Sequence, residues 1–211
     1  MHWVATEPVY TWPYSFFTCA CTCTDDANIN ANSPCADGFI SKDNLSTLPL
    51  NSLGFRNRAH QRIIPSLNFT CDGAISKWII RAQWNGGGTA FPDLQLWRSS
   101  NGDGVYTQVG NTTLSATSQT SSSVYELAVR PSLPFQRGDV LGIFQPNGPL
   151  SRLRIYYRIG SGNPWNFVFR PPAASSVTEP PLESFTTTIS GLRRQTVLPL
   201  VTVEICKPCL A

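Results

Sequence analysis

Short runs of alternating apolar and polar residues, separated by Gly, Pro and Asn, follow one another from Phe55 onward. The clearest run is 153–159, where every second residue from Leu153 to Ile159 is aliphatic or aromatic and the residues between them are Arg or Tyr. Successive side chains of a β-strand point to opposite faces, so a period of two predicts strands. No window in this part of the chain has the spacing of an amphipathic helix. The pattern therefore predicts an all-β fold.

Nine segments have the length and composition of strands. They are 62–71, 75–84, 94–98, 105–109, 124–130, 140–144, 153–159, 166–170 and 197–205. The sequence Asn101-Gly-Asp-Gly104 predicts a hairpin turn between two of them. We expect an antiparallel β-sandwich or jelly roll of about eight to nine strands. An immunoglobulin fold is disfavoured because no second cysteine lies near the central tryptophans.

The apolar face of each expected strand predicts the core. Its members are Ile64, Leu67, Phe69, Trp78, Ile80, Leu94, Leu96, Leu127, Val129, Leu141, Ile143, Ile155, Tyr157, Phe167, Val201 and Val203. The change at Phe55 from irregular sequence to short apolar runs divides the chain into three parts. They are an irregular cysteine-containing segment at 1–54, a β-sandwich domain at 55–205 and a tail at 206–211. The Pro-rich stretch 171–181 is expected to be a loop within the domain.

Cysteines and sequons indicate the compartment. The seven cysteines are Cys19, Cys21, Cys23, Cys35, Cys71, Cys206 and Cys209, and three glycosylation sequons begin at Asn44, Asn68 and Asn111. Charged residues make up only 14% of the chain. Together these features favour an oxidising, extracellular or cell-surface location. A cytosolic protein with free thiols is the alternative.

A disulfide between Cys35 and Cys71 is the expected cross-link. Cys71 directly follows the first strand segment, and Cys35 is the nearest upstream cysteine outside the 19–23 cluster. Cys206 competes for Cys71, because the first and last strands of a sandwich are often neighbours. The asparagine at 68 is the doubtful glycosylation site because it lies inside an expected strand.

The chain shows no secretory signal and no apolar stretch of the ~20 residues that span a bilayer. It is therefore expected to be a fragment of a longer protein. The formal charge of +3 is too small to indicate nucleic-acid binding.

No catalytic residue, metal site or cofactor is predicted. The chain has two histidines, His2 and His60, and no G-x-S-x-G motif, so a Ser or Cys hydrolase is disfavoured. Zinc would need a second ligand pair besides Cys206-Lys-Pro-Cys209. Acids beside Gly or Pro, among them Asp72 and Asp139, are expected to serve turns.

The polar face of the 153–159 segment is the candidate ligand-binding surface. It carries Arg152, Arg154, Tyr156 and Arg158, whose guanidinium groups beside a ring could bind acidic glycans or an acidic protein patch. Trp165 is the candidate for sugar stacking. The alternative is that these arginines form a solvated outer face that also protects the strand from edge pairing.

Five segments, taken together, resemble a family. They are RIIPSLNFTCDGAISKWIIRA at 62–82, PDLQLWR at 92–98, Tyr-x-x-Val at 106–109, GDVLGI at 138–143 and LPLVTVEI at 198–205. Their order is similar to that of uncharacterised ectodomains of invertebrate cell-surface proteins. The resemblance covers about residues 55–205 and implies a single β-sandwich module placed before a membrane span. This chain departs from the pattern, since it has neither the span nor a signal.

The sequence thus predicts a non-enzymatic extracellular recognition or adhesion module that binds a protein or glycan at the cell surface. Two alternatives remain open: a carbohydrate-binding, lectin-like jelly roll and a secreted glycosidase. Two or three exposed aromatic rings on a concave face would favour the first alternative. Two carboxylates facing each other across a cleft would favour the second.

Overall fold

The computed structural model describes residues 35–48, 58–100, 104–159, 166–170, 178–180, 182–188 and 193–206. The described residues form fourteen strands and one short helix. The strands and the helix are β1 (Ala36–Asp37), α1 (Lys42–Leu45), β2 (His60–Phe69), β3 (Gly73–Trp84), β4 (Asp93–Ser99), β5 (Val105–Thr113), β6 (Val124–Phe135), β7 (Val140–Gln145), β8 (Leu153–Ile155), β9 (Tyr157–Ile159), β10 (Asn166–Phe169), β11 (Ser184–Thr186), β12 (Arg193–Gln195), β13 (Val197–Pro199) and β14 (Val201–Cys206). The all-β prediction is confirmed, with more strands than expected.

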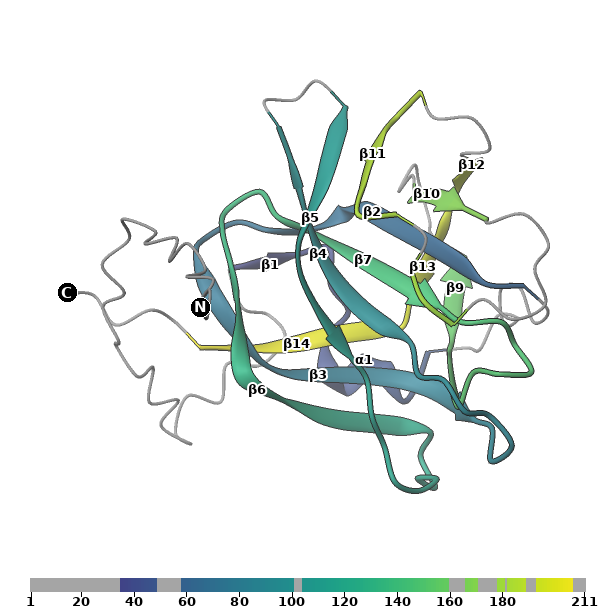
Figure 1. The fold of residues 1–211 in the computed structure, drawn as a ribbon. Coiled ribbons are helices and arrows are strands. Elements are labelled where there is room, and N and C mark those ends of the chain that lie inside the picture. Colours follow the sequence, from purple (N-terminus) through teal and green to yellow (C-terminus); the bar gives the residue numbers. More distant parts are fainter. Residues whose placement is uncertain are drawn as a thin grey trace, which may run out of the picture.

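Two antiparallel sheets pack against each other as a sandwich. The larger sheet has the order β11-β5-β4-β7-β2-β10-β12, with β1 paired to β2. The smaller has the order β14-β3-β6, with β8 paired to the end of β3, and β13 and β9 form a separate pair. Figure 1 shows β14, β3 and β6 running together as one layer. No described helix is long or apolar enough to cross a membrane.

Two of the expected strands are each divided in two. The 153–159 segment breaks at Tyr156, whose N–H donates to the Arg81 carbonyl at 2.9 Å and whose carbonyl accepts from the Leu200 N–H at 2.8 Å. The 197–205 segment breaks at Leu200, whose carbonyl accepts from the Arg81 N–H at 2.9 Å. At Tyr156 the chain passes from pairing with β3 to the β9–β13 pair, and at Leu200 it passes from that pair back to pairing with β3. Alternation in the sequence continues through both breaks, so it does not reveal the change of partner.

Three strands have no counterpart in the sequence prediction. β1, β11 and β12 are two or three residues long and mostly polar. Such strands are too short to show a period of two, and they exist because a longer neighbour offers an edge to pair with.

The core lies between the two sheets, and the predicted set is buried apart from one residue. Ile64, Trp78, Ile143 and the others in that set form one cluster of buried side chains, except Phe167, which belongs to a separate buried cluster. Leu127 is half-buried and packs against the main cluster. It lies on β6, which pairs only with β3 among the described strands and so forms the border of its sheet.

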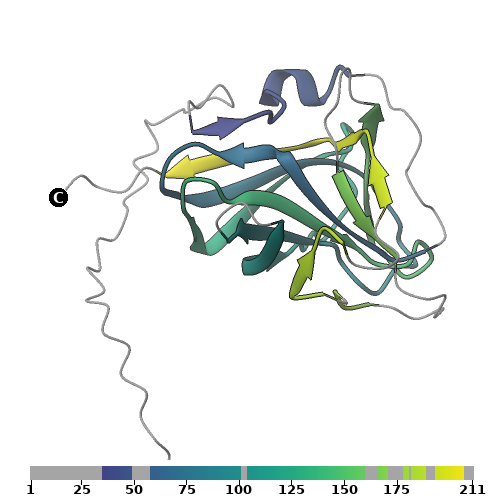
Figure 2. The ribbon, with the colours of Figure 1, turned by 90° about the horizontal axis from the view of Figure 1, so that it is seen from above.

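The segment 35–48 packs on the sandwich. The predicted disulfide is confirmed: Cys35 and Cys71 are bonded, with Cα atoms 5.1 Å apart. Cys206, the competing partner, is itself in a disulfide. Beyond the bridge, β1 and α1 lie along one flank of the sandwich (purple in Figure 2). Leu45 of α1 is fully buried in a cluster that includes Ile79 and Leu200.

Candidate functional site

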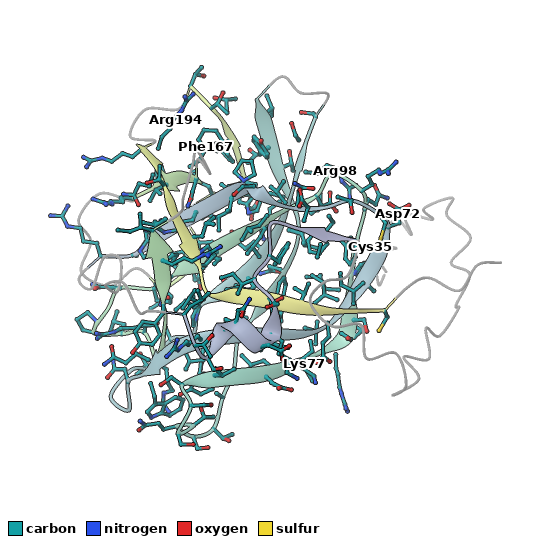
Figure 3. All side chains as sticks on the ribbon, turned by 180° about the vertical axis from the view of Figure 1, so that it is seen from behind. Cys35, Asp72, Lys77, Arg98, Phe167 and Arg194 are labelled. Carbon is teal, nitrogen blue, oxygen red and sulfur yellow. A yellow bond between two sulfur atoms is a disulfide. The ribbon has the colours of Figure 1, made fainter. Side chains whose placement is uncertain are left out.

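An open groove of about 460 Å³ lies where the two sheets approach each other near the disulfide. The start of β3, the ends of β4 and β6 and the middle of β5 line it. Its polar lining includes Asp72 and Arg98, and its apolar lining includes Val109, Pro134 and Phe135. Figure 3 shows Asp72 and Arg98 at the same end of the molecule as Cys35. A concave site with apolar walls and a few placed polar groups is the usual form of a ligand site.

Arg98 is held in place by a buried carboxylate. Asp139 is fully buried and accepts hydrogen bonds from Arg98 Nε at 2.7 Å and from Arg98 Nη2 at 2.9 Å. Asp139 also accepts the Gln136 N–H at 2.8 Å, so it serves the turn that the sequence predicted for it as well as the arginine. The hydrogen bond to Asp139 raises the pKa of Arg98, partly opposed by burial, and the charges of Asp139 and Asp72 raise that pKa further. Bidentate pairing fixes the plane of the guanidinium group at the groove.

Asp72 is held by the turn that contains Arg137. The Arg137 N–H donates to Asp72 Oδ1 at 2.8 Å, and Arg137 Nε donates to the Thr70 carbonyl at 2.8 Å. These bonds tie the turn after β2, which contains the disulfide cysteine Cys71, to the turn after β6. An exposed carboxylate and a half-exposed guanidinium group therefore border the same groove in defined positions.

The apolar side of the groove is rigid. Phe135 stacks on Phe69 with ring centroids 4.1 Å apart. A Cβ on Gly73 would lie 2.6 Å from the Phe135 ring, and one on Gly110 would lie 2.9 Å from Leu133, so both glycines permit close packing. Val109 is 41% exposed, and Ile159 is the other large hydrophobic residue exposed to this degree among the described residues. The groove therefore offers a fixed apolar surface that water covers in the free protein.

The structure brings only part of the predicted arginine surface together. Arg152 Nε donates to the Gly88 carbonyl at 2.8 Å, and its guanidinium carbon lies 5.5 Å from the Trp84 ring. Arg154 Nε and Nη2 donate to the Gly148 carbonyl at 3.1 and 2.7 Å. Both arginines thus support two adjoining loops.

The other residues of that surface have different surroundings. Tyr156 packs against the cluster that contains Ile79, and Arg158 belongs to β9, beyond the break in the strand. All four side chains of the surface are half-buried. Trp165 lies outside the described residues.

The sequons differ in exposure. Asn44 in α1 and Asn111 in β5 are exposed, whereas Asn68 is half-buried in β2. The described ranges hold no group of three His, Cys, Asp or Glu side chains that could bind a metal ion.

Sequence reasoning missed the groove. Asp72 and Asp139 were interpreted as turn residues, and Arg98 and Val109 as ordinary members of strands. The sequence GDVLGI, in which Gly138 has φ +89°, marks the turn that places Asp139, but nothing local links Asp139 to Arg98, 41 residues earlier.

Comparison with models of protein families, with curated proteins and with solved structures finds no match to this chain.

Proposed function

We propose that this protein is a non-enzymatic recognition or adhesion module of a cell-surface or secreted protein, and that the groove binds a segment of a protein ligand. The observation that carries the proposal is the composition of the groove. A fixed guanidinium group and a fixed carboxylate lie beside the exposed apolar side chain of Val109. Polypeptides combine apolar side chains with hydrogen-bonding groups of both signs, so a peptide segment matches all three features. The resemblance to cell-surface ectodomains points the same way.

A protein ligand is favoured over a carbohydrate at this site. Sugar binding by stacking needs an exposed ring face, and Phe135, the aromatic residue that lines the groove, is only 3% exposed. A glycosidase needs two carboxylates across the bond to be cleaved. Here Asp72 is the one carboxylate of the lining, since Asp139 lies behind Arg98 and is bonded to it.

Two features support the extracellular assignment. The Cys35–Cys71 disulfide is of a kind that persists in oxidising compartments. The sequon asparagines Asn44 and Asn111 are exposed, as glycan attachment requires.

Cell binding by a fluorescent multimer of the whole chain tests the proposal. Val109→Glu places a charge in the groove, whereas Ile159→Glu makes the same change at the other exposed hydrophobic position, which does not line the groove. We expect Val109→Glu to abolish binding to responsive cells and Ile159→Glu to leave it within about twofold, because the longer, charged side chain removes the apolar contact of Val109 and projects into the groove. Equal thermal stability of both variants is the control for folding.

Three outcomes would overturn the proposal. Binding that survives Val109→Glu, or that is lost equally in both variants, would remove the groove as the binding site. Binding that is abolished when the cells are stripped of glycans, together with a signal on a glycan array, would instead support the lectin-like alternative.

A further inference from the structure

Two loops are bonded to each other at the end of β3 that lies farthest from the groove. They are 85–92, between β3 and β4, and 146–152, between β7 and β8. The N–H groups of Thr89 and Ala90 both donate to the Leu150 carbonyl, at 2.8 and 2.9 Å. Backbone hydrogen bonds of this kind keep the two loops in fixed positions, so side chains that bond to them are fixed as well.

Arg152 is bonded to the first loop through its Nε atom alone. Nε donates to the Gly88 carbonyl at 2.8 Å. The guanidinium carbon lies 5.5 Å from the centroid of the Trp84 ring and 6.0 Å from that of Phe91. The two rings and the single hydrogen bond hold the guanidinium group in place. Its Nη1 and Nη2 groups donate to no other residue that the structure describes.

Arg154 is bonded to the second loop in a similar way. Its Nε and Nη2 atoms donate to the Gly148 carbonyl at 3.1 and 2.7 Å. A guanidinium group has five N–H donors in a planar fork, and the Nη1/Nη2 edge is the one farthest from the backbone. In both arginines the loop carbonyl occupies the Nε side. The Nη1/Nη2 edge of each therefore remains available to a ligand.

The two arginines are close together and have no carboxylate partner. They are two residues apart in the chain, so their Cα atoms are at most about 7 Å apart. Ser151, Leu153 and Ile155 are buried, whereas Arg152 and Arg154 are half-buried, so both arginine side chains lie on the outward side of this segment. Within the described ranges their partners are backbone carbonyls and aromatic rings. Two positive charges thus share this surface without a neutralising acid.

Gln83 adds a second kind of polar group. It is exposed and lies opposite Arg154 in the pairing of β3 with β8. Directly opposed side chains share a face of the sheet, with Cβ atoms about 5 Å apart. A side-chain amide both donates and accepts hydrogen bonds, so it can bind a hydroxyl group. Acidic sugars carry hydroxyl groups beside their acid groups, whereas the Asp and Glu side chains of a peptide do not.

We propose that Arg152 and Arg154 bind the sulfate or carboxylate groups of an acidic glycan, and that Gln83 binds a hydroxyl group beside them. Both kinds of acid group accept paired N–H donors, which the Nη1/Nη2 edge of an arginine provides. Because the loops fix the guanidinium groups before binding, little side-chain entropy is lost when a ligand arrives. The groove lies at the Gly73 end of β3, so this site does not depend on the function proposed for the groove.

Isothermal titration of the whole chain with three tetrasaccharides tests the proposal. They are a sulfated chondroitin, an unsulfated chondroitin, which has carboxylates alone, and a neutral chitin fragment. We expect saturable binding of the sulfated form and none of the neutral one, and the unsulfated form shows whether carboxylates suffice. Polyglutamate and inorganic sulfate, at the same ionic strength, should both bind at least about tenfold more weakly than the sulfated tetrasaccharide.

Variants assign the binding to the two arginines. Arg152→Gln and Arg154→Gln should each weaken it about tenfold, as loss of a charge-assisted contact does. Arg152→Lys keeps the charge but not the paired donors, and should weaken it about threefold or more. Arg130→Gln is the matched control, because Arg130 is an exposed arginine of β6, and it should change binding less than about twofold. Thermal melting of each variant checks that the loops are intact.

The titrations of the native protein need no variant, and several of their outcomes would overturn the proposal. Neutral and acidic tetrasaccharides that bind equally would remove the role of the acid groups. Polyglutamate that binds as tightly as the sulfated tetrasaccharide would make this a site for acidic protein, and inorganic sulfate that binds as tightly would make it a site for a free ion. Among the variants, equal weakening by Arg130→Gln would reduce the effect to net charge.

Discussion

Gln61 shows how the side chain of a single buried polar residue can hold a neighbouring segment of the chain in place. It lies in the middle of the large sheet and is fully buried. Its side-chain amide donates to the Leu182 carbonyl at 2.9 Å and accepts from the Leu182 N–H at 3.1 Å, as a strand neighbour would. It also donates to Gln95 Oε1, which accepts from Trp97 Nε1 at 3.0 Å. One glutamine thereby attaches the segment before β11 to the outer face of the sheet.

Gly142 is a position in the buried sheet where a single methyl group should be disruptive. A Cβ there would collide with the indole of Trp97, and Trp97 is fully buried and bonded to Gln95. Gly142→Ala should lower the free energy of unfolding by about 1–3 kcal/mol, as overpacking does. Urea denaturation measures this change. Gly87→Ala is the control, because the nearest atom to a Cβ there is 3.9 Å away, and a loss as large in that variant would contradict the steric explanation.

His60 should make stability depend on pH. Burial first, and then the charge of Arg62, lowers its pKa to about 3. An unfolded histidine titrates near 6.5, so between these values the unfolded chain binds a proton that the folded chain does not. Stability contributed by this difference is complete above about pH 6.5 and is lost as the pH falls toward 3, by up to ~1.4 kcal/mol per pH unit.

The variant His60→Gln isolates that effect. On going from pH 7 to pH 5, the native protein should lose about 2 kcal/mol more unfolding free energy than the variant does. Urea denaturation at both pH values is the measurement. Parallel pH profiles for the two proteins would show that His60 is not buried in its neutral form.

At the scale of elements, α1 is attached in two ways that differ in strength. Leu45 is fully buried, and Arg81 Nη1 donates to the carbonyls of Leu45 and Leu48 at 3.1 and 2.8 Å. On the surface, Lys42 and Lys77 form a network of ion pairs with Glu126 and Glu204, at 2.9 to 3.6 Å. These four side chains are 30–42% exposed, so solvent screens the network.

Burial should therefore hold α1 more strongly than charge. Lys42→Met should cost less than about 1 kcal/mol in low salt, and the cost should vanish in 1 M NaCl, where the Debye length is ~3 Å. Leu45→Ala should cost about 2–5 kcal/mol at either salt concentration. Both are measured by urea denaturation. A Lys42→Met effect equal to that of Leu45→Ala would reverse this ranking.

The disulfide attaches the 35–48 segment as a whole. It joins residues 36 apart in the sequence, and closing a loop of this length should stabilise the fold by about 3–4 kcal/mol. The double variant Cys35→Ser/Cys71→Ser should lose that amount in urea denaturation. The native protein under reducing conditions should lose at least that amount, because reduction also opens the disulfide of Cys206. No change in the double variant would mean that packing alone holds the segment.

At the scale of the whole molecule, the groove gathers polar and apolar chemistry at one end of the sandwich. It combines one cation, one carboxylate and apolar surface near the disulfide.

Glycopeptide mapping of protein secreted by eukaryotic cells should find glycans on Asn44 and Asn111 but not on Asn68. Asn44 and Asn111 are exposed, whereas Asn68 is half-buried and lies between Asp37 of β1 and Val140 of β7. Occupancy of Asn68 would mean that modification precedes folding of this strand. Absence of glycans from all three asparagines would count against the extracellular assignment.

The strands, the core and the first disulfide could be predicted from the sequence, because each has a local signal. The alternation of apolar and polar residues from Leu153 to Ile159 predicts which side chains are buried, and turn residues mark where strands end. The breaks at Tyr156 and Leu200, the short strands β1, β11 and β12, and the groove have no such signal. They depend on contacts between distant residues, as when Arg98 meets Asp139 or Arg62 comes level with Arg193 across β10. Burial of apolar side chains follows from composition and period alone, whereas the partner of a polar side chain is set only when the strand order and register bring it near.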